Sequence, residues 1–92
     1  PPMFTFSPAI SFMVNCETQQ EIDHYWDRLS EGGETQQCGW LKDKFGLSWQ
    51  VVPAMLPALL TGGGDKAKRV TATFMKMKKF DIATLQRAAD GA

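Results

Sequence analysis

The chain has 92 residues, which is the length of one domain, and its 43% hydrophobic and 22% charged content exclude a disordered protein. Ten Lys and Arg balance ten Asp and Glu, so no net charge attracts nucleic acid or an anionic membrane. No apolar run approaches the roughly 18 residues of a spanning helix, and we expect no secretory leader. Cys16 and Cys38 form no CxxC pair, so we expect free thiols and a cytoplasmic location.

Residues 10–16 alternate in polarity, which predicts a strand with one apolar face. The side chains expected on the apolar face are Ile10, Phe12, Val14 and Cys16. Those expected on the other face are Ser11, Met13 and Asn15.

A helix is predicted next, because Thr18 and Glu21 stand at the spacing of a capping box. Its apolar residues recur at helical spacing and predict one buried stripe, formed by Ile22, Tyr25, Trp26 and Leu29. Gly32 and Gly33 are expected to end the helix.

Two further strands are predicted at residues 34–41 and 47–52, and the first part of residues 34–41 could form a separate short strand. Asp43 and Gly46 between them are typical of a tight turn. Trp49 and Gln50 are expected on opposite faces of the last strand, which Pro53 should end. The order is strand, helix, strands, so the sequence predicts an α+β fold.

After Pro53 the pattern becomes helical. A short helix is predicted at residues 57–60, followed by a Gly62–Gly64 break. Asp65 is expected to cap a helix that runs to about residue 78, and Asp81 to cap a last helix at residues 82–89. Basic residues concentrate here without interleaved aromatics, which predicts a solvated face rather than a nucleic-acid site.

A family resemblance is carried by three stretches: ISFMVNCETQQEIDHYW (residues 10–26), GGETQQCGWLKDKFGLSWQVVP (residues 32–53) and KMKKFDIATLQRA (residues 76–88). On these stretches the chain resembles the carboxy-terminal half of the PhnB-like proteins. These are members of the glyoxalase/bleomycin resistance/extradiol dioxygenase superfamily, also called vicinal oxygen chelate.

The resemblance implies a single βαβββ module of the glyoxalase/bleomycin-resistance type at residues 1–60. A C-terminal helical extension of the same domain would then occupy residues 61–92. In the superfamily such modules are paired, within a chain or between chains, and their curved sheets enclose a cleft. Because one module is seen here and the chain begins Pro1-Pro2-Met3, we expect either a homodimer or a missing N-terminal module of a longer chain.

The resemblance also raises the question of a metal ion. Metal-dependent members carry a histidine at the start of one strand and a glutamate in the last, and these positions fall here at about Ala9 and on Gln50. Alanine has no lone pair and a neutral amide is a poor ligand for a divalent ion. His24 lies on the polar face of the predicted helix, as a surface histidine would. We therefore expect no metal and no cofactor.

The side chains predicted to line the ligand-binding cleft are Ser11, Met13, Gln37, Trp40 and Gln50. Trp40 could stack on a flat ligand or pack in the core, and the sequence leaves both open. Ser11, Gln37 and Asn15 could contact a ligand or face water on an open sheet.

Two other conspicuous side chains are predicted to be structural. Trp49 alternates with Gln50, so we expect it to pack beneath the helix with Trp26 and Phe12. Cys38 has no histidine base near it in sequence and is expected to be a buried thiol rather than a nucleophile.

Two functional hypotheses follow. The first is a small-molecule-binding protein or enzyme with a metal-independent cleft between paired modules, its small molecule unknown. The second is a non-catalytic dimerisation or ligand-sequestering module. Methylation of demethylubiquinone is associated with the resembled family, but no glycine-rich loop follows a strand here to hold a nucleotide methyl donor.

Overall fold

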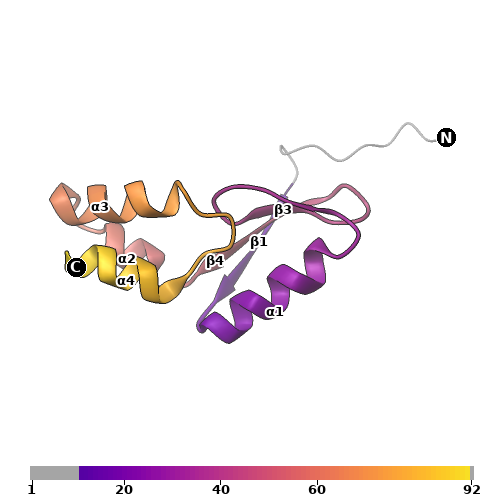
Figure 1. Ribbon diagram of the computed structural model, residues 1–92, viewed down its shortest axis with the longest axis horizontal. Coiled ribbons are helices and arrows are strands. Elements are labelled where there is room, and N and C mark those ends of the chain that lie inside the picture. Colours follow the sequence, from indigo (N-terminus) through magenta and orange to yellow (C-terminus); the bar gives the residue numbers. More distant parts are fainter. Residues whose placement is uncertain (1–10, 92) are drawn as a thin grey trace.

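The computed structural model describes residues 11–91 and shows a mixed α and β fold with a small sheet and four helices. The elements in chain order are β1 (Ser11–Cys16), α1 (Gln19–Ser30), β2 (Glu34–Thr35), β3 (Trp40–Lys42), β4 (Ser48–Pro53), α2 (Leu56–Leu60), α3 (Gly64–Phe74) and α4 (Ile82–Asp90). The sheet and α1 occupy one end of the molecule, and α2, α3 and α4 occupy the other (Figure 1). None of the helices in this range is long and apolar enough to cross a bilayer.

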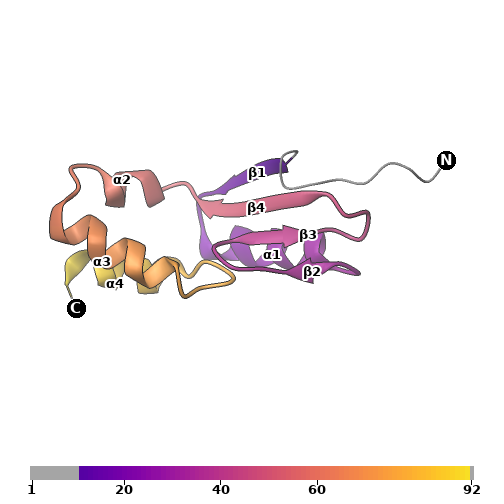
Figure 2. The same ribbon diagram turned by 90° about the horizontal axis from the view of Figure 1, so that it is seen from above.

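The four strands form one sheet in the order β1-β4-β3-β2. β1 runs parallel to β4, whereas β3 is antiparallel to both β4 and β2. In Figure 2 the strands lie side by side with α1 behind them, and no helix lies along the face that is turned towards the viewer. Within residues 11–91, the sheet therefore has one face covered by α1 and one face along which no helix lies.

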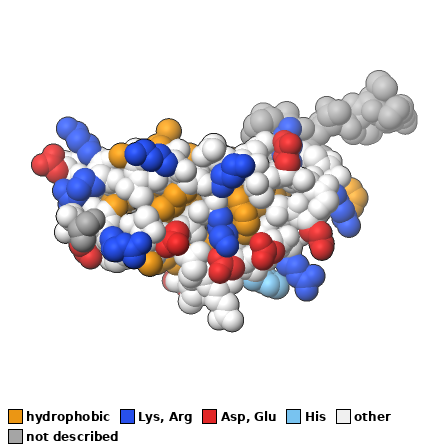
Figure 3. All heavy atoms as spheres, in the orientation of Figure 1, with side chains coloured by type: hydrophobic (Ala, Val, Ile, Leu, Met, Phe, Trp, Pro, Cys, Tyr) orange, Lys and Arg blue, Asp and Glu red, His pale blue; other side chains and the backbone are white. Residues whose placement is uncertain are grey.

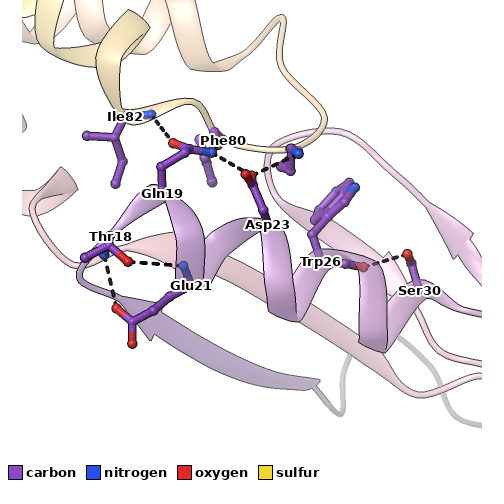
Figure 4. Close-up of polar contacts among 9 residues, drawn as sticks. Thr18, Gln19, Glu21, Asp23, Trp26, Ser30, Phe80 and Ile82 are labelled. Atoms are coloured by element: carbon purple, nitrogen blue, oxygen red, sulfur yellow. Dashed lines mark hydrogen bonds and ion pairs between the residues drawn. The ribbon is translucent and has the colours of Figure 1, made fainter.

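The capping box predicted for α1 is confirmed. The Thr18 hydroxyl accepts a hydrogen bond from the Glu21 amide (3.1 Å), and a Glu21 carboxylate oxygen accepts one from the Thr18 amide (3.1 Å; Figure 4). Ile22 and Trp26 are buried against Leu41 and Val51 of the sheet. Burial of this stripe fixes α1 on the covered face, because an amphipathic helix is held mainly by its apolar side.

Phe12 is less buried than its strand pattern indicates. It lies on the covered face beside Trp49, with ring centroids 5.2 Å apart, yet 53% of its surface is exposed. The reason is its place on β1, which is an edge strand with β4 on one side only among the described residues. The predicted contact of Phe12 with Trp49 is therefore present, but Phe12 is not buried; Trp49 itself is half-buried against the core. Ile10, which was expected on the same face, lies outside the described residues.

The predicted strand at residues 34–41 is interrupted. Cys38 and Gly39 both have positive φ angles, of 58° and 78°, which an extended strand cannot contain. The amide of Gln36 donates to the carbonyl of Trp40 (2.8 Å), closing a turn between β2 and β3. Residues 36–39 therefore form a turn that separates β2 from β3, and we call them the 36–39 turn.

The predicted turn between β3 and β4 is confirmed and is organised by Asp43. Its Oδ1 accepts hydrogen bonds from the amides of Phe45 (2.9 Å) and Leu47 (3.0 Å), and its Oδ2 accepts one from the indole of Trp49 (2.9 Å). Desolvation of the Asp43 carboxylate raises its pKa, but these hydrogen bonds outweigh that effect and leave the pKa below its ordinary value. Gly46 has the positive φ that the turn requires.

The helical end differs from the prediction in two places. Asp65 does not cap α3: Gly63 occupies the N-cap position without a side-chain hydrogen bond, and Asp65 lies in the first turn. The same helix ends at Phe74 rather than near residue 78, because residues 75–81 turn back towards the sheet. The cap on α4 is confirmed, since Asp81 accepts a hydrogen bond from the amide of Thr84 (3.0 Å).

Candidate functional site

Three of the five predicted cleft residues form a row across the sheet on the face without a helix. Met13 on β1 pairs with Gln50 on β4, and Gln50 pairs with Trp40 on β3. Paired residues on neighbouring strands point to the same face, so their side chains lie in line. We call this set, Met13, Gln50 and Trp40, the cleft row.

Within the cleft row, Trp40 and Gln50 are especially close. Hydrogen-bonded residue pairs lie on both sides of Trp40 and Gln50 in the ladder. On one side the amide of Val51 donates to the carbonyl of Gly39 (2.8 Å), and on the other the amide of Asp43 donates to the carbonyl of Leu47 (2.9 Å). Alternation along an antiparallel ladder makes Trp40 and Gln50 a non-hydrogen-bonded pair, in which side chains approach most closely. Both are half-buried, whereas Met13 is 60% exposed.

The other two predicted cleft residues lie at the margins. Ser11 is on the same face as Met13, at the start of β1, and is exposed. Gln37 is exposed in the 36–39 turn and belongs to no strand, so its expected place in a strand of the sheet is wrong. Asn15 is exposed on the face of the cleft row. The structure thus brings together Met13, Gln50 and Trp40 with Ser11 beside them.

Gln50 is held by a hydrogen bond to the 36–39 turn. Its Nε2 donates to the backbone carbonyl of Cys38 at 3.0 Å. Ala9, the other position considered, lies outside the described residues. Within residues 11–91, no three His, Cys, Asp or Glu side chains are grouped to hold a metal ion. Gln50 thus offers no carboxylate at the position where the superfamily resemblance implies a glutamate ligand.

We predict that the purified protein binds no divalent ion at stoichiometry. The physical reason is that the Gln50 amide is neutral and bonded to the Cys38 carbonyl, so no carboxylate ligand is offered there. Elemental analysis by mass spectrometry after mild dialysis tests this, with Gln50→Glu as the variant that restores a carboxylate. Near-stoichiometric zinc, nickel, iron or manganese in the unaltered protein would contradict the prediction.

The cysteines and the histidine offer no nucleophile with a base. Both thiols are free; Cys16 is buried, and burial, with a smaller contribution from the Glu21 charge, raises its pKa. Cys38 is half-buried rather than buried as expected, because the positive φ of the 36–39 turn places its sulfur beside the Phe74 carbonyl (3.8 Å) and the Met75 sulfur (3.8 Å). His24 is exposed on α1, as predicted, with its ring edge on Tyr25.

Within the cleft row, Trp40 and Gln50 are half-buried and Met13 is exposed. A hollow of about 400 Å³ lies elsewhere, between α3 and α4 along Arg69, Thr73, Thr84 and Arg87. Arg69 has a structural task there: its Nε and Nη2 donate to the carbonyls of Ala88 (2.9 Å) and Ala89 (3.0 Å) at the end of α4. Several Lys and Arg side chains lie on the surface at this end of the molecule (Figure 3).

Comparisons with known proteins agree with the fold. Residues 1–52 match the model of the family described as 3-demethylubiquinone-9 3-methyltransferase. A solved structure titled "Putative 3-demethylubiquinone-9 3-methyltransferase, PhnB protein, from Bacillus cereus" is similar at 39% sequence identity and a TM-score of 0.55. That match covers 59% of this chain and 50% of the other, so the chain spans half the length of this relative. Among curated proteins, none matches. Because the family model covers more than half of its residues, the chain belongs to the PhnB-like family, whose model is described as 3-demethylubiquinone-9 3-methyltransferase.

Proposed function

We propose that the chain is one ligand-binding module of the glyoxalase/bleomycin-resistance type, which works as half of a pair. The cleft row forms the floor of one half of a cleft, and a second module supplies the facing wall. The observation that carries the proposal is the alignment of Met13, Gln50 and Trp40 on the sheet face without a helix, with Met13 60% exposed. A bare apolar side chain of this kind is typical of a surface that meets a partner or a ligand.

The length of the relative supports a pair. The Bacillus cereus protein is about twice as long as the part of it that this chain matches, so it has room for a second module. In this chain the second module would come from a second copy, related by a two-fold axis, or from the rest of a longer chain. β1 is one of the two edge strands of the sheet, with no strand on its outer side among residues 11–91, and soluble proteins normally cover such an edge. Pairing would cover both that edge and the cleft row.

The chemistry of the cleft row favours an uncharged ligand. An indole, a thioether and a carboxamide carry no formal charge. The strand register places Lys42 and Glu34 on the same face, where they pair across β3 and β2. A flat apolar group would stack on Trp40 and contact Met13. Methyl transfer, which the family name mentions, is not required for this binding role.

The second hypothesis, a non-catalytic dimerisation module, uses the same surface. In that case the two cleft rows would close on each other, and no small molecule would lie between them. Phe74 and Met77 at the helical end are half-buried and could brace the contact.

Native mass spectrometry of freshly purified protein tests these proposals together. We expect a dimer that carries a co-purified small molecule, and we expect Met13→Lys to abolish both because it places a charge on the cleft row. Gln20→Lys is the matched control, since Gln20 is exposed on α1 and the same charge there should change nothing. A folded monomer at micromolar concentration would refute pairing with a second copy and leave only a second module from a longer chain. A dimer without a small molecule would favour the dimerisation module.

A further inference from the structure

Residues 75–82, which we call the docking segment, connect the helical end of the molecule to the 36–39 turn. The amide of Cys38 donates to the carbonyl of Met77 (2.8 Å), and the amide of Gly39 donates to the carbonyl of Lys78 (2.7 Å). The carbonyl of Cys38 in turn accepts the hydrogen bond from Gln50. A continuous set of hydrogen bonds therefore leads from the docking segment to the centre of the cleft row.

The docking segment is held on its other side by Gln19, at the start of α1. The Gln19 Nε2 donates to the carbonyl of Phe80 (3.0 Å), and its Oε1 accepts from the amide of Ile82 (2.7 Å; Figure 4). In a parallel sheet, a residue opposite Asp81 would make the same two hydrogen bonds with its backbone amide and carbonyl. Here the carboxamide of Gln19 makes them instead.

Two further contacts fix the same segment. Asp23 accepts hydrogen bonds from Gln19 (3.0 Å) and from the ammonium group of Lys79 (2.9 Å), and both lower the pKa of its carboxyl group. Phe80 is fully buried and its ring lies against Gly39 so closely that a Cβ there would be 2.5 Å from it. The docking segment is therefore packed and hydrogen-bonded at both ends, between α1 and the 36–39 turn.

We propose that Gln19 is a positioning residue of the candidate site. It holds the docking segment, the docking segment holds the 36–39 turn, and the turn presents the Cys38 carbonyl that orients the amide of Gln50. The docking segment lies beyond the residues that the family model matches, so the helical extension contributes to the site from outside the matched part. The inference rests on the proposed function only in treating Gln50 as a cleft residue.

Amide hydrogen exchange, measured by nuclear magnetic resonance on the full chain, tests whether Gln19 acts on Gln50 through the docking segment and the 36–39 turn. In Gln19→Ala we expect the amides of Cys38 and Gly39 to exchange about tenfold faster or more, because two hydrogen bonds of the docking segment are lost. The side-chain amide signal of Gln50, assigned by its loss in Gln50→Ala, should shift. The amides of Leu41 and Trp49, which pair at the centre of the sheet, should keep their rates.

Gln20→Ala is the matched control, because Gln20 is the exposed neighbour of Gln19 and should leave all four amides and the Gln50 signal unchanged. Gln19→Asn keeps the amide but shortens its reach, and is judged by the same readouts if Gln19→Ala does not fold. Unchanged Cys38 and Gly39 rates, or rates that rise only in step with Leu41 and Trp49, would overturn the proposal. A missing ligand or dimer would not, since these readouts require neither.

Discussion

Replacing Trp26 by alanine should lower the free energy of unfolding by about 3–5 kcal/mol, the usual cost of removing a buried aromatic side chain. Trp26 is only 7% exposed and, with Ile22, forms the contact of α1 with the sheet. Gln50→Ala should cost no more than about 1 kcal/mol, because it loses one hydrogen bond at a half-buried position. Urea unfolding followed by circular dichroism measures both, at one protein concentration because pairing would add to the stability.

Tyr25→Ala is the control for the Trp26 variant. Tyr25 precedes Trp26 on α1, is also aromatic and is 39% exposed, so its loss should cost clearly less. Equal losses from Trp26→Ala and Gln50→Ala would mean that the covered and uncovered faces of the sheet have been assigned the wrong way round.

Gly39→Ala should destabilise the fold by about 2–5 kcal/mol, through two costs that add. Gly39 has φ of 78°, where an L-residue is strained by about 1–2 kcal/mol. A Cβ would also lie 2.5 Å from the Phe80 ring and 2.7 Å from the carbonyl oxygen of Val51, and overpacking of this kind costs about 1–3 kcal/mol. Because the oxygen belongs to the backbone of β4, it cannot move aside cheaply.

Gly62→Ala separates these two costs. Gly62 has a similar φ of 87°, but a Cβ there meets nothing within 4 Å, so only the backbone strain of about 1–2 kcal/mol is expected. Thermal or urea unfolding of the two variants side by side gives the difference. If Gly39→Ala were no worse than Gly62→Ala, the close packing of Phe80 on the 36–39 turn would be refuted.

The features that the sequence predicted correctly are local or periodic. The Thr18–Glu21 capping box, the Asp43 turn and the Asp81 cap each depend on side chains a few residues apart, so their spacing is enough to predict them. The two faces of β4 follow from alternation alone, so the sequence places Gln50 and Trp49 on opposite faces without knowledge of the strands that pair with β4.

The features that it did not predict depend on contacts between distant residues. A separate short strand in the first part of residues 34–41 was open from the sequence, but the turn at Cys38 and Gly39 was not, because it depends on the docking segment binding their amides. Gln19 looks like an ordinary exposed residue of a helix start, and its role depends on Phe80 and Ile82, more than 60 residues away. Aspartate favours the cap position, which predicts a cap at Asp65, whereas the glycine run allows α3 to begin at Gly64.

The parallel pairing of β1 with β4 sets an order in which the protein can fold during synthesis. β2, β3 and β4 are neighbours in sequence and can pair as soon as they leave the ribosome, but β1 must wait until residue 53 has emerged to meet its partner. Closing such a long loop is slow compared with closing a hairpin. Until then Phe12, Met13 and Val14 form an unprotected segment of high strand propensity, the kind that chaperones bind and that aggregates at high expression.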